Sequence, residues 1–350
     1  MNLQNLLCLC ITRRASDLHL SSGAPPLLRV DGDLISLSDV ALSHDDIHAA
    51  LMTIMSSELQ SLFRQSLECD FSMDVTDVSR FRVNVFQQAR GVSVVFRVIP
   101  HVIPSLQSLH APALFAELMQ RPRGLVLVTG PTGSGKSTTL AAMVDVLNQS
   151  THQHIVTIED PIEFVHTPQQ CLIQQREVGA HTRSFANALR AALREDPDVI
   201  LVGELRDLET IRLAITAAET GHLVLGTLHT SSAAKTMDRI VDVFPAEEKD
   251  MARSMLSESL NAVISQVLCK RKDGAGRVAA YEVMVGTPAV RNLIREGKVA
   301  QLYAAIQTGS AVGMQTLDQS LAALVQQGLI DLQEASRKAK YPEGLSQAKA

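Results

Sequence analysis

A glycine-rich segment, residues 130–137, carries the groups best suited to hold a phosphate. It reads GPTGSGKS and fits the spacing G-x-x-x-x-G-K-[ST]. Glycines let successive backbone N–H groups converge on phosphate oxygens, a lysine bridges the β- and γ-phosphates, and a serine hydroxyl can bind Mg²⁺. The segment therefore predicts a nucleotide site with Mg²⁺ on its last serine. The residues expected to contact the nucleotide are Gly130, Pro131, Thr132, Gly133, Ser134, Gly135, Lys136, Ser137 and the following Thr138.

The flanks of this segment argue against a chance glycine-rich turn. Residues 124–129, GLVLVT, form a nearly all-apolar run that is typical of a strand buried on both faces. Residues 138–143, TTLAAM, can open a helix, and a helix N-terminus adds positive potential for an anion. Strand, loop and helix in this order favour the phosphate site.

Carboxylates follow two further apolar runs. Glu159, Asp160 and Glu163 come after one run, and Gly203-Glu204 ends the next. Hydrolysis needs a group that holds the metal or orients water, and the carboxyl ends of parallel strands meet at one edge of a sheet. We therefore expect Glu163 and Glu204 to face the same γ-phosphate, with solvated loop charges as the alternative for the first three. The second run lacks the aspartate that usually precedes its glutamate, so metal binding there must pass through Glu204, by way of water.

Two histidines, His222 and His229, flank another apolar run at residues 223–228. Side chains alternate between the faces of a strand, so a separation of seven residues does not place both on one face. Either histidine could sense the γ-phosphate, and the alternative is an ordinary polar residue at the end of a strand.

The elements that must position these groups alternate along the chain. Helical spacing of apolar residues appears over 185–193 and 210–220, between the short apolar runs. This alternation predicts an α/β domain with a mostly parallel sheet covered on both sides. Beyond residue 245 we expect helices with short connections. The runs expected to be strands are residues 124–129, 154–158, 199–202 and 223–227.

The first hundred residues predict a small α+β unit. Residues 38–63 carry helical spacing, and residues 80–99 alternate apolar and polar side chains around a glycine-containing turn, which indicates a β-hairpin. Arg82 and Arg97 lie opposite the phenylalanine faces of their own strands. Two prolines within residues 99–105 indicate a linker, and we place the domain boundary there.

Composition excludes several classes of protein. A chain of 350 residues with 46% hydrophobic and 20% charged residues is expected to fold into two globular domains. A net charge of −5 gives no general attraction to nucleic acid. Its 5 cysteines form no CxxC pair, so neither a zinc site nor a disulfide framework is expected. The N-terminus lacks the order of a signal peptide, and no run is long enough to span a membrane, so we expect a cytoplasmic protein.

Several stretches together resemble one family. GPTGSGKST, TIEDPIEF, LREDPDVILVGELRD and TAAETGHLVLGTLHT are similar to boxes of the secretion and pilus ATPases. ASDLHLS at 15–21, RFRVN at 80–84, DVFPAEEK at 242–249 and AVRNLIREGKVAQ at 289–301 resemble the type IV pilus retraction ATPases within that superfamily. The assembly ATPases carry two CxxC pairs after the histidine box, whereas this region holds Cys269 alone. The resemblance therefore favours retraction over assembly.

The resemblance implies a PAS-like α+β N-terminal domain at 1–99, a linker at 100–107, and a RecA-like P-loop NTPase domain with C-terminal helices at 108–350. It implies a homohexamer that hydrolyses ATP with Mg²⁺ at subunit interfaces and powers pilus retraction and twitching motility. Its partners would be an inner-membrane platform protein and an accessory retraction ATPase, at the cytoplasmic face of the inner membrane. The implied catalytic residues are Glu163, Glu204, His229, Arg82 and Arg97, with His222 at the nucleotide, and Ser137 and Glu204 at the metal.

Three other functions compete with this interpretation. An accessory retraction ATPase has the same core, but the AVRNLIRE box and the short tail favour the main motor. A scaffold that binds ATP without hydrolysing it would be favoured by loss of Glu163 or Glu204, and both are present. A nucleic-acid pump is disfavoured by the acidic balance and by the lack of a stretch that mixes aromatic and basic residues.

Overall fold

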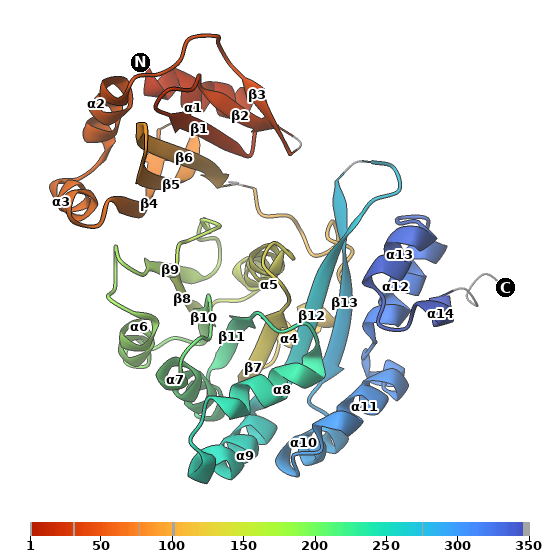
Figure 1. Cartoon of the computed structure of the whole chain (residues 1–350). Helices are drawn as coiled ribbons and strands as arrows, with labels where there is room; N and C mark the ends of the chain where they lie inside the picture. Colours follow the sequence, from red (N-terminus) through yellow and green to blue (C-terminus); the bar gives the residue numbers. More distant parts are fainter. Residues whose placement is uncertain (1, 31, 77, 100–101, 275, 346–350) are drawn as a thin grey trace. The chain divides into compact units, whose positions relative to one another are not determined.

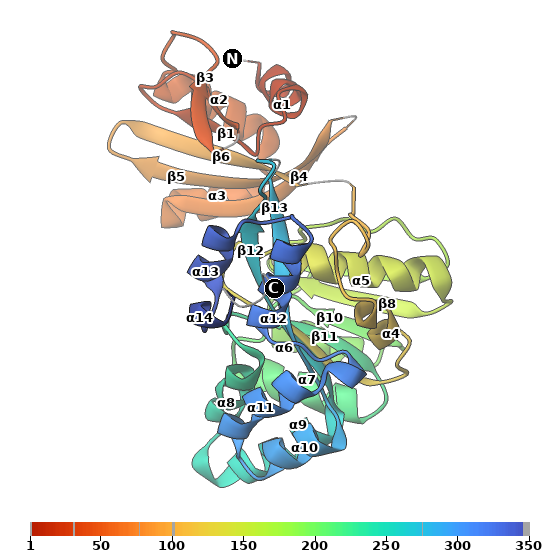
Figure 2. The ribbon, with the colours of Figure 1, turned by 90° about the vertical axis from the view of Figure 1, so that its right-hand side faces the viewer.

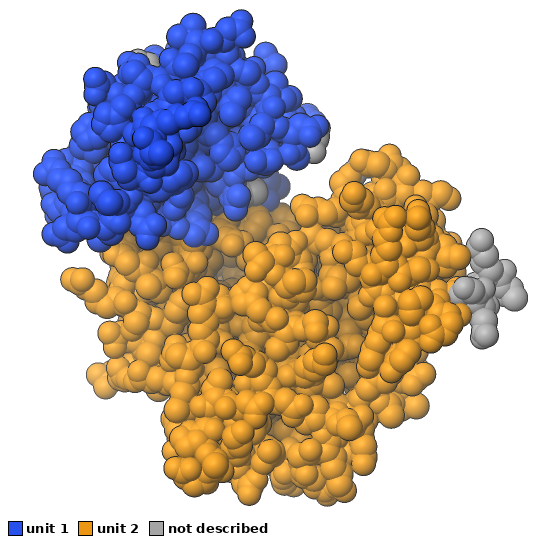
Figure 3. Space-filling model, in the orientation of Figure 1, with its two compact units in different colours: residues 1–102 blue, residues 103–350 orange. Residues whose placement is uncertain are grey.

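The computed structural model describes residues 2–30, 32–76, 78–99, 102–274 and 276–345. The chain divides into two compact units, Met1–Val102 and Ile103–Ala350, which Figure 3 colours separately. The linker expected at 100–107 includes residues 100 and 101, which lie outside the described residues. Each unit is described below by itself.

The first unit is a six-stranded antiparallel sheet with helices packed on one face (Figure 1). Its strand order is β3-β2-β1-β6-β5-β4. Apolar side chains of all three helices join those of the strands in one core. The elements are α1 (Leu3–Thr12), β1 (Asp17–Ser21), β2 (Leu27–Val30), β3 (Asp33–Ser36), α2 (His44–Ile54), α3 (Ser57–Ser66), β4 (Glu68–Val75), β5 (Ser79–Gln88) and β6 (Gly91–Ile99).

The hairpin expected at residues 80–99 is confirmed as β5 and β6. Phe81 and Phe96 are fully buried, while Arg82 and Arg97 lie on the other face and are direct cross-strand neighbours. The helical pattern at 38–63 resolves into two helices rather than one. The break occurs because the Ser56 hydroxyl accepts a hydrogen bond from the backbone N–H of Leu59 and so starts α3.

The second unit is built on a seven-stranded sheet of order β13-β12-β7-β11-β10-β8-β9. Each neighbouring pair is parallel except β12 and β13. Helices cover the sheet on both sides (Figures 1 and 2). The strands are β7 (Gly124–Thr129), β8 (His154–Glu159), β9 (Leu172–Glu177), β10 (Val199–Val202), β11 (Leu223–Leu228), β12 (Leu260–Lys270) and β13 (Arg277–Val285).

Every residue of β7, β10 and β11 is buried, which explains why these strands read as continuous apolar runs. The expected α/β domain with a mostly parallel sheet is therefore confirmed. Its helices up to the end of the sheet are α4 (Leu114–Met119), α5 (Lys136–Ser150), α6 (Phe185–Ala192), α7 (Leu208–Glu219), α8 (Ala233–Asp242) and α9 (Lys249–Ser259).

The expectation that only helices follow residue 245 is wrong. β12 and β13 form a long antiparallel hairpin that joins the sheet beside β7. Most of their residues are buried, in unbroken runs along each strand, so neither strand shows the alternation that marks a half-exposed strand.

The remaining helices are short, and α12 packs on β13 and α13 on β12 (Figure 2). Among the described residues, no helix has the length and apolar character needed to cross a bilayer. These last helices are α10 (Pro288–Arg295), α11 (Leu302–Thr308), α12 (Leu317–Gln326), α13 (Leu332–Lys338) and α14 (Pro342–Leu345).

Candidate nucleotide-binding site

The glycine-rich segment forms a loop between β7 and α5. Gly133 and Gly135 adopt φ values of 76° and 88°, in the left-handed region that glycine enters without strain. Gly135 precedes α5, and no side chain caps the first N–H groups of that helix. These N–H groups and the positive end of the helix suit a phosphate, so the loop fits a nucleotide.

Gln266 of β12 supports this loop through a hydrogen bond of its side chain. Its Nε2 donates a hydrogen bond of 2.6 Å to the carbonyl oxygen of Ser134. A Cβ atom at Gly130 would lie only 2.4 Å from the Gln266 carbonyl oxygen, so glycine is required for the loop to pack against this strand. This role of Gln266 could not be predicted, because residues beyond 245 were expected to be helical.

The ammonium group of Lys136 lies within the loop. Its Nζ donates hydrogen bonds of 2.9 Å and 3.2 Å to the carbonyl oxygens of Gly130 and Pro131. Burial lowers the pKa of Lys136, and the charges of Glu204 and Glu163 act in the opposite direction. Both carboxylates therefore act on the same ammonium group, and the chain brings these three sequence-predicted groups to one site.

The acidic segment after β8 is held by buried acceptors. The Glu159 carboxylate accepts hydrogen bonds from Thr157 Oγ1 at 2.6 Å, from Gln175 Nε2 at 3.2 Å and from the backbone N–H of Glu163. Burial is the main cause that raises the pKa of Glu159 to about 6. Glu159 therefore anchors the loop that carries Glu163.

A second carboxylate, Glu177 at the end of β9, accepts a hydrogen bond of 3.1 Å from the backbone N–H of Ile162. Ile162 and Phe164 are buried, while Glu163 between them is exposed. The loop is thus fixed on both sides of Glu163 and presents its side chain to the solvent. Glu177 could not be predicted as a support of this loop, because nothing near it in the sequence marks its contact with Ile162.

Glu204 lies just beyond β10 and contacts two basic side chains. His229 Nε2 lies 3.1 Å from its Oε1, and Arg206 Nη2 lies 2.6 Å from its Oε2. Partial burial acts to raise the pKa of Glu204, but the contacts with Arg206 and His229 outweigh it and hold the pKa below its usual value. Glu204 is therefore ionised at neutral pH, as a group that binds metal or orients water must be.

Gly203, directly before Glu204, lies where the usual aspartate would stand. A Cβ atom there would be 3.1 Å from the carbonyl oxygen of Ile158 and 3.2 Å from the Cα of Glu159. The Gly203 N–H also donates a hydrogen bond of 2.7 Å to Ile158, and its carbonyl oxygen accepts one from Thr227 Oγ1. Close packing between β8 and the end of β10 thus depends on the missing side chain.

The two histidines lie at opposite ends of β11. His229 follows its carboxyl end, beside the phosphate loop, whereas His222 precedes its amino end. The Nδ1 of His222 lies 3.0 Å from the carbonyl oxygen of Ala217, at the end of α7. The structure therefore brings His229, but not His222, to the phosphate loop of the same chain.

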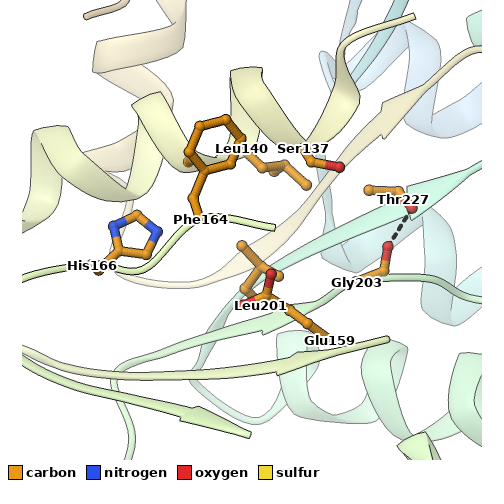
Figure 4. Close-up of a pocket in the computed structure, with 9 residues that line it drawn as sticks. Ser137, Leu140, Glu159, Phe164, His166, Leu201, Gly203 and Thr227 are labelled. Atoms are coloured by element: carbon orange, nitrogen blue, oxygen red, sulfur yellow. Dashed lines mark hydrogen bonds between the residues drawn. The ribbon is translucent and has the colours of Figure 1, made fainter. Parts of the chain in front are cut away.

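A small pocket opens beside the start of α5 (Figure 4). Ser137 of the phosphate loop lies on one side of it, and the ends of the strands with Gly203 and Thr227 lie on the other. Phe164 and His166, which come just after Glu163 in the chain, also line this pocket. The pocket therefore lies between Ser137 and the ends of the neighbouring strands.

His166 is a titratable side chain that lines this pocket. The side chain is buried and its Nδ1 has no hydrogen-bond partner among the described residues. Burial lowers the pKa of His166 to about 4. The folded chain therefore favours the neutral imidazole, whereas the unfolded chain binds a proton at an ordinary histidine pKa. The free energy of unfolding is thus highest above pH 6.5, and it falls as the pH is lowered toward 4.

We expect the substitution His166→Gln to make the folded chain less sensitive to acid. Between pH 7.5 and pH 5, the free energy of unfolding should fall by about 2 kcal/mol less in the variant than in the native chain. Urea unfolding at the two pH values measures this difference. His152→Gln, at an exposed histidine, is the matched control. Equal losses in the native chain and in His166→Gln would show that His166 does not resist protonation.

Arg82 and Arg97 lie in the first unit, and each contacts a carboxylate. Arg82 Nη2 is 2.5 Å from Asp70, and Arg97 Nε is 2.7 Å from Asp17. Both arginines are on the sheet face opposite the helices, as the alternation of β5 and β6 predicted.

A family model described as "Type II/IV secretion system protein" matches residues 3–337. Over 343 residues the sequence is 61% identical to the type IV pilus retraction ATPase PilT of Pseudomonas aeruginosa, which covers 98% of this chain and 99% of that protein. It is 56% identical over 339 residues to a twitching motility protein of Neisseria gonorrhoeae, covering 95% and 91% of the two chains.

The fold is similar to that of the pilus retraction motor PilT, whose crystal structure holds ADP. The two structures agree with a TM-score of 0.92 at 46% identity, over 99% of each chain. This likeness confirms the expected fold class, a PAS-like α+β domain followed by a RecA-like domain with C-terminal helices.

Proposed function

The chain belongs to the family of type II/IV secretion system proteins, and from this we infer that it is an ATPase motor that powers the retraction of type IV pili. One observation carries the proposal from the structure itself. The charges of Glu163 and Glu204 both act on the ammonium group of Lys136, and no side chain caps the N-terminus of α5, the helix that follows this phosphate loop. A retraction ATPase needs this combination of a phosphate cradle and acidic groups, because its force comes from hydrolysis.

We assign the following roles at this site. The loop from Gly130 to Thr138 holds the phosphates, and Lys136 neutralises charge on the β- and γ-phosphates. Ser137 and Glu204 would hold Mg²⁺, which supplies charge neutralisation at the transferred phosphoryl group. Glu163 orients or deprotonates the attacking water, and His229 reports the γ-phosphate through its contact with Glu204.

The assembly we propose is a homohexamer. Arg82 and Arg97 belong to the first unit, and His222 lies at the end of β11 that is remote from the phosphate loop. In a ring, we propose that these three side chains reach the nucleotide of a neighbouring subunit. Arginine suits this role because its planar fork meets two phosphate oxygens and stays charged. An inner-membrane platform protein would receive the force, with the motor at the cytoplasmic face of that membrane.

We expect Arg82→Ala or Arg97→Ala to lower ATP hydrolysis by at least about tenfold, since arginine fingers in other NTPases contribute about 10³–10⁵-fold. Mixing Lys136→Ala chains with Arg82→Ala chains should restore part of the activity. Some interfaces then pair an intact loop with an intact arginine. Phosphate release from the mixture, with mixed rings verified by two affinity tags, measures the recovery. Verified mixed rings that stay inactive would show that Arg82 does not act in trans.

Removal of the gene tests the function in the cell. Cells without a retraction motor should keep their pili and lose twitching motility. Loss of the pili themselves would indicate an assembly ATPase. Retained twitching under weak load would favour the accessory retraction ATPase, the second candidate, although 61% identity to a retraction ATPase favours the main motor.

A further inference from the structure

A row of charged side chains crosses the sheet of the first unit. The strand register places Arg29 of β2 beside Asp17 of β1, Asp17 beside Arg97 of β6, and Arg97 beside Arg82 of β5. All four belong to adjacent strands of one sheet, which Figure 1 shows as β2, β1, β6 and β5. The row thus holds three arginines and one aspartate on the sheet face that the helices leave open.

Arg82 and Arg97 are direct cross-strand neighbours, and like charges in that position repel each other. Each is neutralised from its outer side. Asp17 contacts Arg97 from β1, and Asp70 contacts Arg82 from the edge strand β4. The two carboxylates thus allow the two arginines to lie together, but they do so in different ways.

In the Asp17–Arg97 pair, the carboxylate holds the Nε side of the guanidinium and leaves the rest of this group exposed to solvent. The side chain of Asp17 is 4% exposed and that of Arg97 is 66% exposed. The contact is made by Arg97 Nε, at 2.7 Å from Asp17 Oδ1. The second oxygen of Asp17 accepts a hydrogen bond of 2.7 Å from Ser16 Oγ, so the carboxylate is itself held in place. A guanidinium oriented in this way presents its two Nη groups to an incoming anion.

In the second pair, the Asp70 carboxylate occupies the edge of the Arg82 guanidinium that an anion would use. Arg82 Nε donates to Asp70 Oδ1 at 3.3 Å and Nη2 donates to Oδ2 at 2.5 Å, which is the two-pronged geometry of a carboxylate or a phosphate on arginine. Both side chains are partly exposed, at 39% for Arg82 and 41% for Asp70. An exposed pair of this kind is weak and can be exchanged for a stronger ligand.

We propose that Asp17 is a positioning residue that prepares Arg97 for the nucleotide, and that Asp70 competes with the nucleotide for Arg82. The inference rests on the proposed function, in which both arginines reach the phosphates of a neighbouring subunit. Asp17 then promotes ATP hydrolysis and Asp70 restrains it. Two aspartates on the same face of one sheet therefore have opposite effects on turnover.

The test compares Asp70→Asn, Asp17→Asn and Asp74→Asn in the full-length chain. Asp74 is the matched control, because it lies on β4 four residues from Asp70 and contacts Arg80 instead. Asp70→Asn should raise kcat/KM for ATP by about two- to fivefold, the range that an exposed ion pair spans. Asp74→Asn should leave it unchanged. The gain from Asp70→Asn should disappear in an Arg82→Ala background.

Asp17→Asn should lower kcat to about the level of Arg97→Ala, with an unchanged dissociation constant for nucleotide, in a chain that is still folded at the assay temperature. In an Arg97→Ala background, Asp17→Asn should cause no further loss of kcat. A general structural defect would instead lower kcat further. If Arg82→Ala and Arg97→Ala themselves leave turnover intact, the proposed role of the arginines fails and the inference fails with it. If they lower turnover but Asp70→Asn does not raise it, the competition by Asp70 is overturned while the proposed function stands.

Discussion

Lys136→Ala should abolish ATP hydrolysis and leave the fold intact. The lysine ammonium is the cation of the phosphate loop; it donates to loop carbonyl oxygens, and the charges of Glu163 and Glu204 act on it. Burial has already removed part of its hydration, as its lowered pKa indicates, so a phosphate that reaches it gains a strong contact. Alanine removes this charge at the bond that must break.

Phosphate release by the purified variant measures the effect, and thermal unfolding verifies the fold. Lys272→Ala is the matched control, because Lys272 is exposed in the loop that follows β12. We expect hydrolysis by Lys136→Ala to be indistinguishable from background and hydrolysis by Lys272→Ala to be native. Turnover in Lys136→Ala at even a tenth of the native rate would contradict the assignment of the site.

Glu204→Gln should reduce turnover by at least about 100-fold while nucleotide binding changes little, since acid–base and metal-linked groups act on the chemical step. The substitution keeps the shape of the side chain and removes the charge that Arg206 and His229 contact. A carboxylate at the end of a strand acts on metal and water more than on the affinity for the nucleotide.

Nucleotide affinity and steady-state hydrolysis, measured on the same preparation, separate the two contributions. Glu209→Gln on α7 serves as the control, because that glutamate is exposed and contacts Arg190 on the surface. A parallel fall of binding and hydrolysis in Glu204→Gln would assign Glu204 a structural role instead.

The phosphate loop and the acidic groups could be predicted because their signals are local. A fixed spacing within residues 130–137, and carboxylates at the ends of apolar runs, are readable without knowing the rest of the chain. The strands β7, β10 and β11 were equally readable, because full burial makes each a short apolar run between turns.

The supports of the site could not be predicted, because each depends on a partner far away in the sequence. Gln266 reaches Ser134 across 132 positions, and Glu177 reaches Ile162 across a β-strand pairing that no local pattern marks. The two strands β12 and β13 were missed for a related reason. Burial on both faces removes the alternation that would distinguish them from helices.

The glycine before Glu204 also couples this position to the acidic loop. An aspartate here would place its Cβ atom 3.1 Å from the carbonyl oxygen of Ile158 and 3.2 Å from the Cα of Glu159, which is tighter than an ordinary van der Waals contact. Backbone atoms cannot rotate away as a side chain can, so β8 and the end of β10 would have to move apart by a few tenths of an ångström. This movement would displace Glu159, which holds the loop that carries Glu163. A side chain added at Gly203 would therefore act on the acidic loop as well as on its own strand.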